Sequence, residues 1–234
     1  MNSQPEVSLQ CSLPGGQKLS TGEIDAWELK AARRALQNLK TLLQGQPMLG
    51  LLARQIEEGD TYFKSLIAKS NGQFKESRVD FSAEGITSSQ FLEWFKIVDT
   101  KETPEGIRRF YLDIMAPAHP EHYALGPYPI GIIETIGQHI CRVRIDNTVE
   151  VPQFVRNYGD SAYDKKLPVT CYLDDGTVFF YGFQELRDTK HGCDFRFRII
   201  FPAASPQILF DEHTEHLAIE FRSWITAASK SYHK

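Results

Sequence analysis

Cysteines are few in this sequence and far apart. They lie at Cys11, Cys141, Cys171 and Cys193, so the chain contains no Cys-x-x-Cys pair. A cysteine zinc site or a dithiol redox motif would normally show such a pair. We therefore expect reduced, mostly buried thiols in a cytoplasmic protein.

An excess of positive charge and long apolar runs are also missing. Lysine and arginine number 26 against 30 aspartates and glutamates, which gives a formal net charge of −4. Nucleic-acid-binding domains and polybasic membrane anchors concentrate basic residues, and this chain has no such patch. No apolar run approaches the roughly 20 residues that a membrane span needs, and residues 1–22 lack the pattern of a signal peptide. The sequence thus predicts neither a nucleic-acid partner nor membrane association.

The remaining composition fits one globular domain with an N-terminal extension. Of the 234 residues, 41% are hydrophobic and 12% aromatic, which is enough for a sizeable core. Residues 1–22 are rich in Ser, Gln, Gly and Pro and predict a flexible arm, which leaves residues 23–234 as a single domain. Apolar spacing of three and four predicts helices at residues 23–43, with Thr21 as cap, and at residues 48–69, with Gly59-Asp60 as the place for a break.

The second half of the chain predicts strands. A short helix opened by Thr87 precedes them, and Asp174-Asp175-Gly176 is a strong hairpin turn. Phe195, Phe197 and Ile199 alternate with Arg196 and Arg198, as in a sheet with one packed face. Segments rich in β-branched and aromatic residues lie at 130–136, 140–145, 169–173, 178–186 and 195–201. With a final helix to residue 231, this order predicts an α+β fold of the helix-grip type, a curved antiparallel sheet around a long C-terminal helix that encloses an apolar cavity.

Histidines and glutamates form three candidate metal-binding clusters, at residues 119–122, 134–139 and 213–220. His216 and Glu220 are four apart, so both lie on one face of the last helix and can chelate one ion. Glu134 interrupts an apolar run, where a carboxylate would be expensive to bury without a partner. A cation would supply that partner.

Five segments, in order along the chain, resemble the hydrolase family of 2,4-diacetylphloroglucinol hydrolase and phloretin hydrolase. They cover most of residues 80–225. The segments are Gly-Ile-Thr-Ser-Ser-Gln-Phe-Leu-Glu-Trp-Phe at 85–95, Pro-Ala-His-Pro-Glu-His at 117–122, Ile-Glu-Thr-Ile-Gly at 133–137, Gly-Cys-Asp-Phe-Arg-Phe-Arg at 192–198, and His-Leu-Ala-Ile-Glu-Phe at 216–221.

This resemblance implies a helix-grip enzyme with one zinc ion held by His122, Glu134, His216 and Glu220. The reaction it implies is hydrolysis of a carbon–carbon bond in an acylated phenol or a polyketide-type β-diketone, a reaction of secondary metabolism. The metal would polarise the acyl carbonyl, and a nearby acid would protonate the leaving ring carbon. Candidates for that acid are Tyr123, Tyr128 and His119. The family's active-site histidine in a Gly-His-Gly context has no counterpart here. The resemblance therefore supports the fold and the metal site better than it supports the reaction.

Several alternatives stay open. His119, His139 and His213 are substitute metal ligands. The same metal could instead serve an isomerisation, dehydration or cyclisation of a polyketide-type carbonyl compound, and helix-grip domains also act as non-catalytic carriers of small molecules. The partner in each case is a small aromatic or polyketide-like compound. A homodimer is compatible with the sequence. Trp94 and Trp224 are expected in the core, and Arg196 and Arg198 are expected to point out of the sheet or to pair with carboxylates.

Overall fold

The computed structural model describes residues 9–99, 103–126 and 131–233, and its backbone contacts divide the chain into two units, Met1–Leu39 and Lys40–Lys234. The division falls within the first long helix, α1 (Thr21–Leu43), beyond the boundary at residue 22 that the sequence predicts. Two short strands, β1 (Cys11–Ser12) and β2 (Lys18–Leu19), pair in the first unit.

Ser20, and not Thr21, caps helix α1. The Ser20 hydroxyl accepts from the amide of Glu23, and the Glu23 carboxylate accepts in return from the amide of Ser20 at 2.8 Å. Thr21 is already the first helical residue. The cap is therefore a reciprocal box one residue earlier than predicted.

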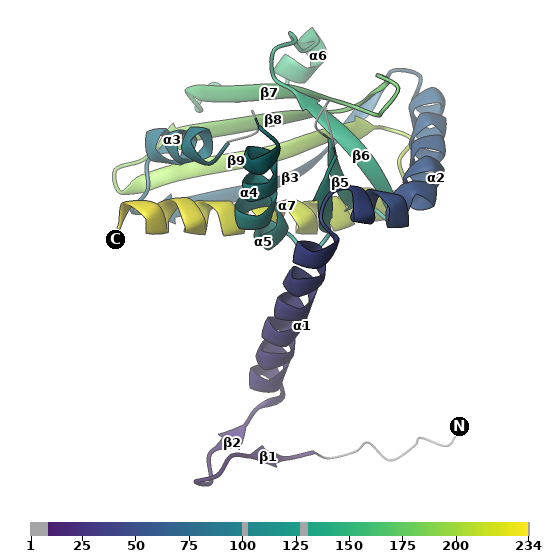
Figure 1. Ribbon diagram of the computed structural model, residues 1–234. Coiled ribbons are helices and arrows are strands. Elements are labelled where there is room, and N and C mark those ends of the chain that lie inside the picture. The colour runs from purple at the N-terminus through teal and green to yellow at the C-terminus, as the bar shows by residue number, and fades with distance from the viewer. Residues whose placement is uncertain (1–8, 100–102, 127–130, 234) are drawn as a thin grey trace, which may run out of the picture. The chain divides into compact units, whose positions relative to one another are not determined.

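A seven-stranded antiparallel sheet, strongly curled into a half-barrel, dominates the second unit (Figure 1). Six strands follow one another as a meander. The first strand of the sheet lies at one edge, where it pairs with the last strand over eleven positions. The spatial order is β3 (Phe74–Glu84), β9 (Gly192–Pro202), β8 (Val178–Asp188), β7 (Lys165–Tyr172), β6 (His139–Asp146), β5 (Ile132–Ile136) and β4 (His122–Leu125). This confirms the α+β class, the antiparallel curved sheet and its long C-terminal helix.

Helices pack on the sheet and carry the chain from one of its edges to the other. The C-terminal helix α7 (Gln207–Tyr232) contacts β3, β5 and β9, and α2 (Gln46–Ser70) lies against β6. Between β3 and β4 the chain runs through α3 (Ser88–Val98), α4 (Pro104–Phe110), the π-helical turn η1 (Tyr111–Met115) and α5 (Ala116–Ala118). Thr87 and Gln90 form the predicted capping box of α3. No helix in the described part of the chain has a stretch long and apolar enough to cross a membrane.

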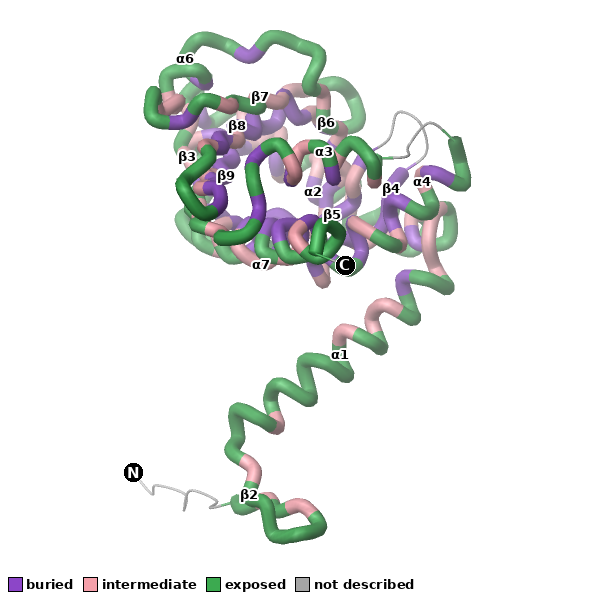
Figure 2. Tube along the Cα trace, turned by 90° about the vertical axis from the view of Figure 1, so that its left-hand side faces the viewer, coloured by how far each residue is buried: buried purple, intermediate pink, exposed green. Residues whose placement is uncertain are grey.

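The core lies between the concave side of the sheet and α7. Trp94 and Trp224 belong to it as predicted, and the ring of Phe197 on β9 stacks on Phe221 of α7 with 3.5 Å between centroids. Figure 2 shows the buried residues along the strands and α7. The stacked rings of Phe197 and Phe221 lie between β9 and α7, in the region where we expected an apolar cavity. Cys141, Cys171 and Cys193 are buried free thiols.

The other face of the sheet carries charged pairs under the β6–β7 connection, which contains α6 (Gln153–Arg156). Arg198 is 1% exposed and binds the carboxylates of Glu185 and Glu76, each at 3.1 Å. Its guanidinium also donates to the carbonyl of Tyr158, and Glu185 accepts from the amide of Asp160. The ion pairs of Arg198 and the hydrogen bonds to Tyr158 and Asp160 link the connection to the sheet.

Gly59 does not break the second predicted helix. Helix α2 runs without interruption from Gln46 to Ser70, and Gly59 is buried where the helix meets β6. A Cβ atom at Gly59 would lie 2.0 Å from the carbonyl oxygen of Ile140. The missing side chain thus permits close approach of helix and strand.

Replacement of Gly59 by alanine should destabilise the protein by about 2 kcal/mol or more, because α2 must move off β6. Gly50 provides the matched control, since it lies exposed in the same helix and its Cβ would meet nothing within 4 Å. The Gly50→Ala variant should gain about 0.5–1 kcal/mol from helix propensity. Urea unfolding followed by circular dichroism measures both changes, and equal effects of the two substitutions would contradict this packing role.

Candidate metal centre

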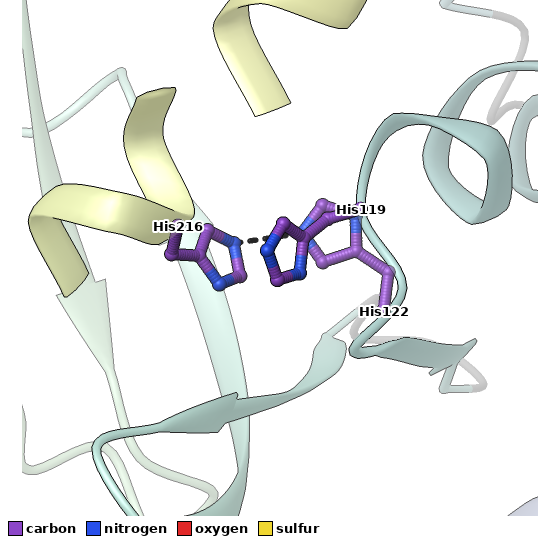
Figure 3. Close-up of side chains that lie close together, drawn as sticks. All are labelled: His119, His122 and His216. Carbon is purple, nitrogen blue, oxygen red and sulfur yellow. Dashed lines mark hydrogen bonds between the residues drawn. The ribbon is translucent and has the colours of Figure 1, made fainter. Parts of the chain in front are cut away.

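Three segments far apart in the sequence bring histidines and glutamates together inside the second unit. His122 begins strand β4 and pairs directly with Glu134 of β5 in the sheet register. His216 and Glu220 lie one turn apart on the buried side of α7. Figure 3 shows His119, His122 and His216 with their rings gathered between the α7 helix and the segment that leads into β4.

His122 lies close to each of the other three residues that the sequence singles out as ligands. The Nε2 atom of His122 lies 3.1 Å from Nε2 of His216, 3.3 Å from Oε2 of Glu134 and 3.3 Å from Oε1 of Glu220. A distance of 3.6 Å joins Nε2 of His216 to Oε2 of Glu134. None of the four residues is more than 8% exposed. Two imidazoles and two carboxylates therefore share one largely dry space.

Backbone groups fix the orientation of His122. Its Nδ1 atom lies 2.9 Å from the carbonyl oxygen of Met115, the last residue of the π-helical turn. Because a carbonyl only accepts, Nδ1 must carry the proton, and in the neutral ring the lone pair lies on Nε2. Tyr111 in the same turn donates its hydroxyl to the carbonyls of His122 and Tyr123. The π-helical turn thus directs the unprotonated nitrogen of His122 toward the other three side chains.

His119 differs from His122 in its protonation pattern. The ligand atoms of His119, His122 and His216 lie within 4.8 Å of one another, and the His119 ring stacks on His216 at 3.7 Å between centroids. However, Nδ1 of His119 accepts the amide proton of Glu121 at 3.1 Å. In the neutral ring Nε2 of His119 therefore carries a hydrogen and is a donor.

Lys40 holds the backbone of this segment, and sequence reasoning missed it. Its ammonium group is 1% exposed and donates to the carbonyls of His119 at 3.0 Å and Ala116 at 3.2 Å. In the sequence Lys40 is one of several basic residues on a helix, and no pattern distinguishes it from its exposed neighbours.

Burial and mutual charge shift the pKa values of these groups in different directions. Burial alone would lower the pKa of His122, but the carboxylates of Glu134 and Glu220 outweigh it and raise that pKa. Burial, assisted by the neighbouring histidines, lowers the pKa of His216 well below its ordinary value. Burial also raises the pKa of Glu220 to about 8. Without a cation, this group of residues therefore holds protons between its carboxylates and imidazoles.

The two other substitute ligands lie in different places. His213 is 4% exposed and stacks on His216 with 5.1 Å between centroids, so it borders the cluster. Burial lowers its pKa to about 4. His139 instead stacks on Tyr62 of α2 at 3.8 Å and meets the edge of Phe63. The structure therefore brings His213, but not His139, to the cluster.

The candidate tyrosines are less central than the histidines. Tyr123 lies at a bulge in β4, and its hydroxyl contacts Oγ1 of Thr135 at 3.0 Å. Tyr128 lies outside the described residues. Tyr181 is buried in a separate apolar cluster with Val151 and Val155.

A cleft of about 650 Å³ opens beside the cluster. Most of the side chains that line it are polar or charged, so this space differs from the apolar cavity that the sequence predicts. The lining residues are His119, Pro120, Glu121, Thr135, Gly137, Gln138, Glu212, His213, Glu215, His216 and Ile219.

Comparison with known proteins adds no family to these observations, because no family model and no curated protein matches the chain. The chemistry must therefore be argued from the residues themselves. Three buried histidines that lie close together, His119, His122 and His216, could bind a metal ion.

The raised pKa of Glu220 predicts a pH-dependent difference between the chelator-treated wild type and its Glu220→Gln variant. The folded protein keeps a proton on this carboxyl up to about pH 8, whereas the unfolded chain releases it near 4.5. The contribution of this carboxyl group to the free energy of unfolding is complete below about pH 4.5. It falls as pH rises, by up to about 1.4 kcal/mol per pH unit, and is lost once pH has passed about 8. Because its side chain stays neutral, the variant should become more stable relative to the wild type as pH rises.

Urea unfolding at a series of pH values in the presence of chelator measures this difference. Glu93→Gln serves as the control, because Glu93 is exposed on α3 and outside the cluster. A difference between Glu220→Gln and wild type that stays constant with pH would contradict a protonated Glu220.

Proposed function

We propose that this chain is a metal-dependent hydrolase whose ion is held by His122, Glu134, His216 and Glu220. The observation that carries the proposal is that four distances among these ligand atoms, three from His122 and one from His216 to Glu134, are 3.1 to 3.6 Å. Four ligands at about 2.0–2.1 Å from a tetrahedral zinc lie about 3.3–3.4 Å from one another. These four distances fit such an ion.

The charges and lone pairs of the four groups also fit a dication. The Nε2 lone pair of His122 faces two carboxylate oxygens at 3.3 Å, an arrangement that is repulsive unless a proton or a cation lies between the groups. Two carboxylates balance the charge of one divalent ion, so the loaded centre would be neutral inside the protein. Two nitrogen and two oxygen ligands suit zinc, with manganese, iron or cobalt as substitutes.

His119 serves better as a hydrogen-bond donor than as a metal ligand. Its Nδ1 atom is occupied by the amide of Glu121, so ligation through Nε2 would require removal of the remaining ring proton. With that proton in place, Nε2 of His119 can donate a hydrogen bond to an oxygen bound beside His216. Lys40 keeps the carbonyl of His119 in position for this role.

The resemblance to the 2,4-diacetylphloroglucinol hydrolase family supports a particular reaction. A bound zinc ion supplies Lewis-acid polarisation of a substrate carbonyl. Hydrolysis of an aryl ketone then adds the hydroxyl group of water to the acyl carbon and a proton to the ring carbon, so that a carboxylic acid and a free phenol result. Tyr123 is our candidate for the donor of that proton, and Nε2–H of His119 would hydrogen-bond the oxyanion that develops on the acyl group. We propose the helix-grip family for the fold, and the reduced thiols support a cytoplasmic location.

Metal analysis of purified, zinc-supplemented protein tests the ligand set. The wild type should hold about one equivalent of zinc per chain, and alanine at any of the four ligand positions should lower that content markedly. His191→Ala is the matched control, since His191 is exposed and distant from the cluster. Wild-type protein with far less than one equivalent of zinc would refute the centre. Full zinc occupancy in Glu134→Ala would mean that another residue, and not Glu134, is the fourth ligand.

His119→Asn distinguishes a hydrogen-bond donor to the reacting group from a metal ligand. This variant should keep its zinc but lose about 10²- to 10³-fold in the rate of hydrolysis of an acylated phloroglucinol. Release of the carboxylic acid, followed by liquid chromatography, reports the reaction and separates hydrolysis from isomerisation or cyclisation. Loss of zinc from His119→Asn would make His119 the third histidine ligand.

A further inference from the structure

The cleft beside the histidines carries charge of one sign. Three carboxylates line it, those of Glu121, Glu212 and Glu215, and none of the described residues in its wall is a lysine or an arginine. The Oε2 atom of Glu212 is buried without a hydrogen-bond partner among the described residues. An ionised oxygen removed from water in this way needs a positive or hydrogen-donating partner.

Nothing at the neighbouring centre compensates this charge. A divalent ion at the proposed site would be neutralised by Glu134 and Glu220, so the loaded centre adds no net positive charge to the cleft. Lys40 is buried behind His119, where two carbonyl oxygens hold its ammonium group, and it does not line the cleft. The cleft thus stays negative whether or not the metal is bound.

An unpartnered buried nitrogen provides an independent sign of a ligand. His213 lines the cleft and is 4% exposed, and its Nδ1 atom has no hydrogen-bond partner among the described residues. A buried imidazole nitrogen in a polar cleft normally finds a donor. With its ring hydrogen on Nε2, His213 offers Nδ1 as an acceptor. Together with the carboxylates of Glu121 and Glu212, this places three acceptor groups in one cleft, which matches the three N–H bonds of a primary ammonium group.

We propose that this cleft binds an organic cation, a protonated amine held by Glu121, Glu212 and His213. The proposal rests on the proposed function in one respect only, because it treats this amine as the enzyme's substrate. The negative charge of the cleft does not depend on the metal. Among acylated phenols and related carbonyl compounds, the proposal favours those that carry an amine over neutral ones, and it predicts that carboxylates are repelled. An acidic product of hydrolysis would leave the cleft readily for the same reason.

Three probes of one shape and different charge test this proposal. Benzylammonium, benzyl alcohol and benzoate should be titrated by calorimetry into chelator-treated protein, so that none of them can bind through a metal. Benzylammonium should bind at least about tenfold more tightly than benzyl alcohol, and benzoate should be the weakest. The same order should hold after zinc is restored, with zinc content measured separately.

Substitutions locate the binding site. Glu121→Gln and Glu212→Gln should each weaken benzylammonium binding by about fivefold or more and leave benzyl alcohol binding nearly unchanged. Glu93→Gln removes one exposed carboxylate outside the cleft and should change neither. Binding of the three probes within about twofold of one another, or tightest binding of benzoate, would overturn the proposal. Failure of the proposed metal centre would instead appear in the zinc analysis and leave this order of affinities intact.

Discussion

Two carboxylates buried beside two imidazoles impose the main constraint on this structure. Glu134 and Glu220 are each 8% exposed and both reach His122 at 3.3 Å. Ionised carboxylates are stable in such a place only when positive charge or protons accompany them. The pairing of β4 with β5, the π-helical turn and the orientation of α7 all bring these groups together. A shift of one residue in any of them would leave a buried charge alone.

Local sequence patterns were sufficient to predict most of the fold. Segments rich in β-branched and aromatic residues located five strands of the seven-stranded sheet, and the turn Asp174-Asp175-Gly176 joins β7 to β8 as expected, with Gly176 at a φ of 86°. The final helix was also predicted, and His213, His216 and Glu220 are buried on it. Two signals located the cluster: the four-residue spacing of His216 and Glu220, and the carboxylate of Glu134 within an apolar run.

Features that depend on approach in three dimensions had no such signal. Gly59 looked like a helix break because propensity describes a helix by itself, whereas here the helix lies against the carbonyl of Ile140. Lys40 acts on residues 76 and 79 positions further along the chain, so no local pattern could reveal it. The apolar cavity was expected because strand alternation predicts only which side chains face inward. Their sizes decide how much space remains, and the rings of Phe197 and Phe221 stack between the sheet and α7.

The pairing of β3 with β9 has a consequence for the order in which the protein forms during synthesis. Strand β3 ends at Glu84, and its partner begins only at Gly192. While the intervening residues are being translated, β3 has an open edge and no sheet to join. Contacts of such long sequence separation form slowly and leave strand edges available to other chains. Since α7 follows β9 in the sequence, the histidine cluster can be completed only after that helix has been synthesised.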